Sequence, residues 1–231
     1  MSTTTSATLP DILLIGATGR TGRLVLESAL KRGHKVVALI RESSSLSPQT
    51  NLKIAKGSPL EPAAITTALA LTTGPVIIIS TLGQTRTSGN PFAATTSPPL
   101  FMSHSASAVV QAATAPKFRV QKLILMSMFG TGSSFANLNC LMQATMRYSN
   151  MKQSLDDQNA VDEIVKQSGL TFVMPRPAML KGETALPVKS LGDAGEKAGF
   201  MPSVSAQSCA EFMLDAATSA EWDGKTPVLS N

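Results

Sequence analysis

A short apolar run that leads directly into a glycine-rich loop constrains the fold of this 231-residue chain more than any other feature. The run Asp11–Ile15 (DILLI) predicts a strand buried on both faces, and residues 21–32 predict a helix that stops at Gly33. Between them lies a GxxGxxG loop made of Gly16, Gly19 and Gly22. In such a strand–loop–helix unit the glycines allow a tight turn, a close approach to a pyrophosphate and close helix packing. The N-terminus of the helix then attracts phosphate, so the loop predicts a dinucleotide site.

Apolar runs and helix-like stretches alternate along the rest of the chain. We predict further strands at residues 35–40, 52–55, 76–80, 122–127 and 171–174. We predict further helices at residues 62–71, 99–115, 154–168 and 205–218. This order predicts an α/β fold, a Rossmann doubly wound parallel sheet with helices on both faces and a small C-terminal substrate-binding region. From the length we expect residues 1–231 to form a single NAD(P)-binding domain.

The loops that follow the carboxyl ends of the strands should build the sites, because ligands of open parallel sheets bind there. Three irregular segments fall in these places, and we expect the substrate pocket to come from residues 84–104, 128–147 and 178–202. The residue that ends the second strand selects between NAD and NADP. It is Arg41, which can pair with a 2′-phosphate, and Arg20 could add a second cation, so NADP(H) is the predicted cofactor.

Composition narrows the class of protein. Hydrophobic residues make up 43% and charged residues 15%, which excludes a disordered chain, and the net charge of +5 is scattered, which argues against nucleic-acid binding. There is no apolar run long enough to span a bilayer and no signal peptide, so we expect a cytoplasmic protein without a membrane partner. The two cysteines and two histidines show no metal-site spacing, and no metal is predicted.

Three segments carry a resemblance to a known family: GATGRTG at 16–22, ALIRESSSL at 38–46 and SGLTFVMPRPAML at 168–180. They resemble the atypical short-chain dehydrogenases/reductases of the NmrA-like, NAD(P)-binding group. The spacing from Asp156-Asp157-Gln158 to Ser168-Gly169-Leu170 is similar to that in the biliverdin-IXβ reductase, or flavin reductase, branch. The resemblance spans roughly residues 11–215. It implies a Rossmann fold, NADPH, reduction of a small organic acceptor, and a monomer or weak homodimer.

The resemblance also implies roles for individual residues. The diphosphate would be held by Gly16, Thr18, Gly19, Arg20, Thr21 and Gly22. The remaining cofactor contacts would come from Arg41 at the 2′-phosphate, Gly57 and Ser58 near the adenine, Thr81, Leu82 and Gly83 at the nicotinamide-side ribose, Ser127 beside the nicotinamide, and Pro177 at its carboxamide. Ser58 stands where the family often has Asp, which weakens that contact.

A YxxxK pattern is the strongest catalytic candidate. Short-chain dehydrogenases use a Ser, a Tyr that donates a proton and a Lys that lowers the pKa of the Tyr. Here the residues would be Ser127, Tyr148 and Lys152, with Tyr148 lying 21 residues after Ser127. The relatives similar to biliverdin reductase lack this Tyr. The alternative is an amphipathic Tyr148 at a helix start and a solvated Lys152, with Ser127 as a positioning group and solvent as the proton source.

Other residues have a functional and a structural interpretation. Met128 and Phe129 could line an apolar pocket for a flat substrate, and His104 and Met179 are further substrate-binding candidates, although a surface His and a core Met are the alternatives. Asp156 and Asp157 are expected to cap the helix that starts near residue 154. Arg176 is expected to make a structural ion pair, and His34 to be structural.

Three functions remain open at the level of sequence. The first is an NADPH-dependent reductase of a small conjugated, aromatic or quinone-like substrate, in fungal secondary metabolism by analogy. The second is a non-catalytic NADP(H) sensor like the NmrA-like regulators, which sustained NADPH consumption would exclude. The third is a redox-neutral isomerase, cyclase or dehydratase, which would show no net oxidation of cofactor.

Overall fold

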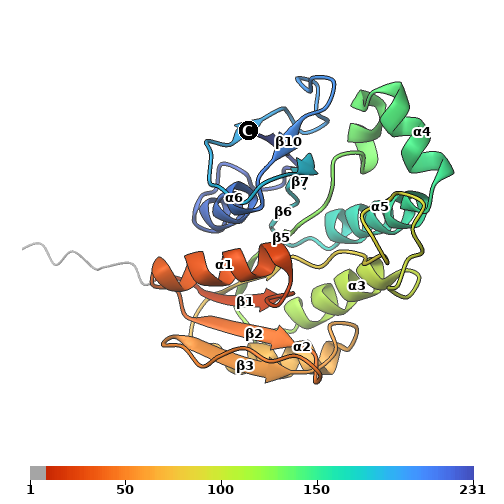
Figure 1. Ribbon diagram of the computed structural model, residues 1–231. Coiled ribbons are helices and arrows are strands. Elements are labelled where there is room, and N and C mark those ends of the chain that lie inside the picture. The colour runs from red at the N-terminus through yellow and green to blue at the C-terminus, as the bar shows by residue number, and fades with distance from the viewer. Residues whose placement is uncertain (1–8) are drawn as a thin grey trace, which may run out of the picture.

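A six-stranded parallel sheet organises the computed structural model, which describes residues 9–231 (Figure 1). The strand order is β3-β2-β1-β4-β5-β6, and every neighbouring pair is parallel. The strands are β1 (Asp11–Ile15), β2 (Val36–Ile40), β3 (Leu52–Lys56), β4 (Val76–Ser80), β5 (Val120–Leu125) and β6 (Phe172–Val173). The order steps outward from β1 in both directions, so the loops after β1 and β4 leave the sheet beside one another. The predicted Rossmann doubly wound sheet is confirmed.

Helices cover both faces of the sheet. One face carries α1 (Arg20–Lys31) and α6 (Ala206–Thr218), which also pack on each other (Figure 1). The other face carries α2 (Pro62–Leu69), α3 (Phe101–Ala113) and α5 (Met151–Gln167). Within β1, Ile12 and Leu14 enter the first core and Leu13 and Ile15 enter the second. Burial on both faces explains why the run DILLI contains no polar residue after Asp11.

Some predicted boundaries were wrong near the carboxyl end of β5. The strand ends at Leu125 and leaves Ser127 in the following loop, although a strand to residue 127 was predicted. Residues 128–147 were predicted only as a pocket segment, but they form a 3-10 helix (Gly132–Asn137) and then α4 (Cys140–Tyr148). Asn139 caps α4, since its side chain accepts a hydrogen bond from the backbone N–H of Met142 at 2.9 Å.

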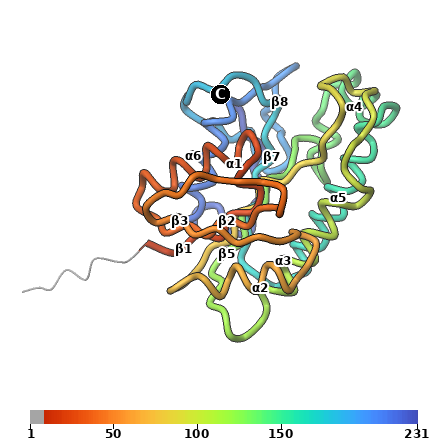
Figure 2. The backbone as a smooth tube through the Cα atoms, turned by 60° about the horizontal axis from the view of Figure 1, so that its bottom comes forward, coloured from red at the N-terminus to blue at the C-terminus, as the bar shows by residue number. Residues whose placement is uncertain are grey.

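Short strands near the C-terminus form two further sheets. The order β7-β11-β9 joins Arg176–Pro177, Val228–Ser230 and Lys189–Ser190, and β8 (Met179–Leu180) pairs with β10 (Ser203–Val204). Figure 2 shows β7 and β8 at the top of the view, on the same side of the molecule as α4. A third apolar cluster, which includes Phe129, Met146 and Val228, lies between these segments. No helix in residues 9–231 is both long and apolar enough to cross a bilayer.

Candidate cofactor and substrate site

The glycine loop after β1 forms a backbone cradle that is packed too closely for Gly16 or Gly22 to carry a side chain. A Cβ on Gly22 would lie 2.0 Å from the carbonyl oxygen of Gly16, and a Cβ on Gly16 would lie 2.8 Å from Oγ1 of Thr81. Gly16 also has φ +90°, a conformation that favours glycine. The Thr81 hydroxyl lies 3.3 Å from the carbonyl oxygens of both Ile15 and Gly16, which holds the loop against the end of β4. The cradle is therefore fixed by close packing.

The N-terminus of α1 opens into this cradle. Gly19 is its N-cap residue and supplies no side-chain hydrogen bond to the first turn. Backbone N–H groups of that turn, which includes Arg20, Thr21 and Gly22, therefore have no competing side-chain acceptor at the N-cap. Free N–H groups and the positive end of a helix suit an anion, so the residues present fit a diphosphate.

A cavity of about 280 Å³ extends from the cradle along the carboxyl ends of β1, β2 and β4. Seven of the predicted cofactor-binding residues line it: Gly16, Thr18, Gly19, Arg41, Thr81, Leu82 and Gly83. Arg41 is exposed and takes part in none of the ion pairs found among residues 9–231. The turn that contains Arg41 is held by Lys56, whose ammonium donates to the carbonyl of Glu42 at 3.2 Å. The structure thus presents one unpaired guanidinium at the β2 end of the cavity.

The other predicted adenine contacts lie beside the cavity rather than on its wall. Gly57 packs against α2, since a Cβ there would lie 2.6 Å from Cβ of Ala64. The Ser58 hydroxyl oxygen accepts a hydrogen bond from the backbone N–H of Leu60 at 3.2 Å. Pro59, which the sequence reasoning missed, lines the cavity instead.

A hairpin built from residues 84–98 forms the outer wall of the cavity. Arg86 and Thr95 form an antiparallel bridge, and the N–H of Thr96 donates to the carbonyl of Thr85 at 2.8 Å. Thr85, Thr96, Ser97, Pro98 and Phe101 line the cavity from this side. The segment had been predicted to contribute to a substrate pocket, and no hairpin was predicted there.

Ser127 lies two residues beyond β5, the strand on the other side of β4 from β1 and its glycine loop. Its N–H donates to the carbonyl of Pro175 at 2.8 Å, and the N–H of Phe129 donates to the carbonyl of Pro177 at 3.1 Å. The loop therefore continues the parallel pairing with β7, and Pro177 lies next to Phe129. The Ser127 side chain is buried, and its hydroxyl has no hydrogen-bond partner within residues 9–231.

The predicted substrate-contacting residues take different positions. Met128 is half-buried, whereas Phe129 is buried in the third cluster beneath Gly195, whose added Cβ would lie 2.6 Å from the Phe129 ring. Met179 is 39% exposed on β8. His104 is exposed on α3.

The structure does not bring the Ser, Tyr and Lys candidates together. Tyr148 is the last residue of α4, not the start of a helix as the alternative interpretation had it, and is 79% exposed. Lys152 pairs with Asp156 at 2.5 Å on the exposed surface of α5. Neither side chain reaches the unpaired hydroxyl of Ser127.

The prediction that Asp157 caps its own helix was wrong, because the N-cap residue of α5 is Asn150. Asp157 is fully buried, and its carboxylate accepts hydrogen bonds from the backbone N–H groups of Met102 and Ser103, each at 2.9 Å. The N-cap residue of α3 is Leu100, which has no side-chain acceptor, so α5 supplies one. Asp157 also accepts from the Gln84 amide at 2.9 Å and thereby holds the base of the hairpin.

Arg176 has the structural role that was expected. Its side chain is completely buried and donates to Asp162 at 2.8 Å and to the carbonyl of Asp193 at 2.9 Å. His34 is also structural, with Nδ1 lying 2.9 Å from the carbonyl oxygen of Pro10.

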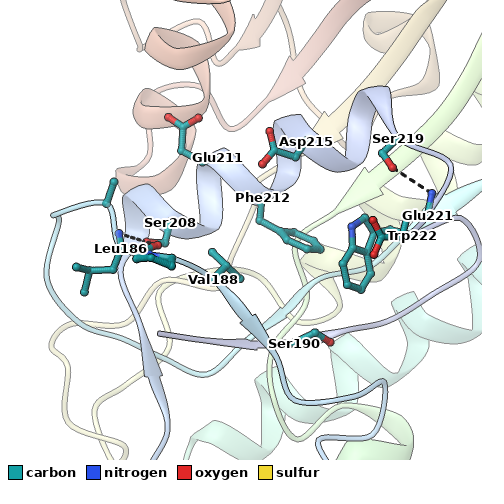
Figure 3. Close-up of a pocket in the computed structure, with 12 residues that line it drawn as sticks. Leu186, Val188, Ser190, Ser208, Glu211, Phe212, Asp215, Ser219, Glu221 and Trp222 are labelled. Atoms are coloured by element: carbon teal, nitrogen blue, oxygen red, sulfur yellow. Dashed lines mark hydrogen bonds between the residues drawn. The ribbon is translucent and has the colours of Figure 1, made fainter.

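A separate cleft of about 440 Å³ lies between α6 and the segment 185–190 (Figure 3). Phe212 and Trp222 meet edge to face in it, 5.0 Å apart between ring centroids. Glu211 points toward α1, where it bonds to Ser28 at 2.6 Å and to Arg32. The predicted pocket segment 178–202 contributes residues 185–190 to this cleft, but none of the individually predicted site residues lines it. Among residues 9–231 no group of three side chains is arranged to hold a metal ion.

Comparisons with known proteins agree with this geometry. The model of a family described as NAD(P)H-binding matches residues 16–220. Among solved structures, the anaerobillin reductase ChuY of Escherichia coli has 19% identity and a TM-score of 0.72, covering 95% of this chain and 96% of that one. A short-chain dehydrogenase/reductase of Veillonella parvula in complex with NADP has 12% identity and a TM-score of 0.72, covering 97% and 95%. An oxidoreductase of Lactococcus lactis, ylbE, has 19% identity and a TM-score of 0.72, covering 96% and 90%.

No curated protein sequence matched. The solved structures share the fold of this chain, and the family match covers most of its length, including the whole glycine loop and the strand ends around it. The chain therefore belongs to the NAD(P)H-binding family of Rossmann-fold proteins.

Proposed function

We propose that this protein is an NADP(H)-dependent reductase of a small conjugated, aromatic or quinone-like substrate. The observation that carries the cofactor preference is the exposed, unpaired Arg41 at the β2 end of a cavity that begins at the glycine cradle. A guanidinium at this place can bond a 2′-phosphate through two parallel hydrogen bonds. The relative solved with NADP and the relative that is an anaerobillin reductase support a reductase of this kind.

The order of the strands determines which half of the cofactor would lie where. Since β2 and β4 flank β1, a dinucleotide whose 2′-phosphate is at Arg41 crosses the glycine cradle and extends over the ends of β4 and β5. When bound, NADPH supplies a hydride. The chain contributes Thr81, Leu82 and Gly83 along that path and the buried hydroxyl of Ser127 at its end. Met126 and Met128 flank Ser127 and offer an apolar, adaptable surface for a flat acceptor.

We further propose that solvent supplies the proton. Tyr148 is 79% exposed, and Lys152 is held by Asp156 rather than by a group near Ser127. Tyr148→Phe should therefore change kcat by less than about threefold, whereas removal of an essential proton donor would cost about 100-fold or more.

Ligand-induced thermal stabilisation tests the proposal. A ligand at about 100 times its Kd adds roughly 2.7 kcal/mol of stability, which raises Tm by several degrees. We expect NADPH and NADP⁺ to raise Tm more than NADH and NAD⁺, and Arg41→Ala to remove that difference. Arg119→Ala is the matched control, because Arg119 is exposed just before β5, at the amino-terminal ends of the strands and therefore on the side of the sheet away from the cavity.

The outcomes separate the three functions that the sequence left open. Stabilisation by NADPH followed by its oxidation with a quinone supports the reductase. Stabilisation without oxidation by any acceptor favours a sensor. Equal stabilisation of wild type and Arg41→Ala by NADPH contradicts the role of Arg41. The absence of any nucleotide effect contradicts both the reductase and the sensor and leaves the redox-neutral enzyme.

A further inference from the structure

Unpaired polar atoms are rare inside proteins, and in this chain Ser127, in the loop after β5, and Gln158, on α5, each carry one. Among residues 9–231 the buried side-chain atoms without a partner include Oγ of Ser127 and Oε1 of Gln158. Each residue is only 6% exposed. Such a group in a native structure requires an explanation, and a ligand that completes the hydrogen bond is one.

The first half of α5, which carries Gln158, lies at the same edge of the sheet as the loop that carries Ser127. The helix leads into β6, whose pairing with β5 is parallel, so its first half lies at the carboxyl edge of the sheet. Val161, on α5, lines the same small void as Leu125 and Met126. Gln158 precedes Val161 by about one helical turn, in the direction of the loop that follows Leu125 and carries Ser127.

The neighbours of Gln158 on α5 are fixed to the loops after β4 and β5. Ser154 donates to Oε1 of Gln84 at 2.8 Å, and Asn159 accepts from the N–H of Gly132 at 2.8 Å. One turn further on, Asp162 accepts from Arg176 at 2.8 Å. The helix is thus held from both sides, while the carboxamide oxygen of Gln158 between these contacts has no partner.

We propose that the Gln158 carboxamide, together with the Ser127 hydroxyl, binds the reacting carbonyl group of a neutral substrate; this inference rests on the proposed reductase function. Both groups are uncharged, and Asp162 holds the two nearby cations, Arg176 at 2.8 Å and Lys166 at 2.6 Å. A neutral oxygen is the partner that these groups fit.

Glutamine suits a group that changes during reduction. Reduction adds a hydride, supplied by the proposed activity, and a proton from solvent, and it turns the carbonyl oxygen into a hydroxyl. An amide carries both a donor and an acceptor, and a half-turn about its last bond exchanges them. Gln158 can therefore donate to the carbonyl of the substrate and accept from the hydroxyl of the product.

The test compares wild type, Gln158→Leu and the control Gln167→Leu, which changes an exposed glutamine at the end of the same helix. The probe is menadione, a neutral quinone, with NADPH as reductant. We expect Gln158→Leu to raise KM for menadione by roughly 10-fold, the equivalent of one hydrogen bond, with KM for NADPH and the NADPH-induced rise in Tm unchanged. Calorimetric titration of menadione into the NADP⁺ complex should show the same loss of affinity without turnover.

Stability separates binding from a structural role. Replacement of an unpaired polar group by an apolar one of similar shape is nearly neutral, so the Tm of Gln158→Leu should stay within about 2 °C of wild type. A large fall in Tm, or an unchanged affinity for menadione in an active protein, overturns the inference alone. A wild type that binds NADPH but neither binds nor reduces menadione and other neutral carbonyl acceptors overturns the proposed function, and the inference with it.

Discussion

At the scale of single residues, Gly22 shows how strictly the glycine cradle is determined. An added methyl group would lie 2.0 Å from the carbonyl oxygen of Gly16 and 2.7 Å from Oγ1 of Thr81, so the loop or the helix would have to move. We expect Gly22→Ala to lower the free energy of unfolding by about 1–3 kcal/mol, the usual cost of overpacking. It should also abolish the NADPH-induced rise in Tm, because the cradle is the proposed diphosphate site.

Gly74→Ala is the control for this prediction, since a Cβ there meets no atom within 4 Å. Urea unfolding with and without NADPH measures both effects. A Gly22→Ala protein that kept the full NADPH effect would show that the diphosphate does not depend on this close contact.

At the scale of secondary structure, α3 depends on a cap from another helix. Asp157 of α5 accepts both N–H bonds at the start of α3, while the adjacent Asp156 faces solvent and pairs with Lys152. We expect Asp157→Ala to cost about 2–4 kcal/mol, the sum of two lost caps in a buried place, and Asp156→Ala to cost less than about 1 kcal/mol. Equal costs in urea unfolding would contradict the capping role.

The contact between α1 and α6 gives stability a dependence on pH. Burial raises the pKa of the Glu211 carboxyl, but hydrogen bonds from Ser28, Arg32 and Gln207 outweigh burial and hold the pKa below its ordinary value of 4.5. A carboxyl with a lowered pKa contributes stability that is present above its ordinary value and is lost as the pH falls through its value in the folded protein. Wild type should therefore be more stable than Glu211→Gln at pH 7, and the difference should disappear in acid below that folded value. A difference that persists unchanged in acid would contradict this assignment.

Local sequence predicted the elements whose signals are local. The runs DILLI and VIIIS and the glycine loop identify the sheet and the diphosphate cradle, because a doubly covered strand and a tight turn each need particular residues. The role of Asp157 could not be predicted, since a cap contributed by another helix leaves no signal next to α3. The positions of Tyr148 and Ser127 were not predicted either, because α4 buries only Met146 and the end of β5 is set by its pairing with β4.

At the scale of the whole molecule, β11 joins parts of the chain that lie far apart in sequence. It lies between β7 and β9, and its first two residues enter different cores: Val228 the third cluster and Leu229 the first, both fully buried. The N–H groups of Arg176 and Ala178 donate to the carbonyls of Pro227 and Leu229 at 2.8 and 3.0 Å. The loop that carries Ser127 pairs in turn with residues 175–177, so the C-terminal strand supports the proposed substrate end of the site.

Deletion of residues 226–231 should therefore unfold the protein rather than remove one edge strand. Two fully buried side chains contribute about 1.5–3 kcal/mol each and each lost hydrogen bond about 1 kcal/mol, which together approach the roughly 5–15 kcal/mol that stabilises a domain. Leu229→Ala, which keeps the strand, should lose about 2–5 kcal/mol and still unfold cooperatively in urea. If the shortened chain still unfolded in one cooperative step with NADPH binding intact, β11 would be an accessory strand, and the substrate end of the site would be held by β5 and α5 alone.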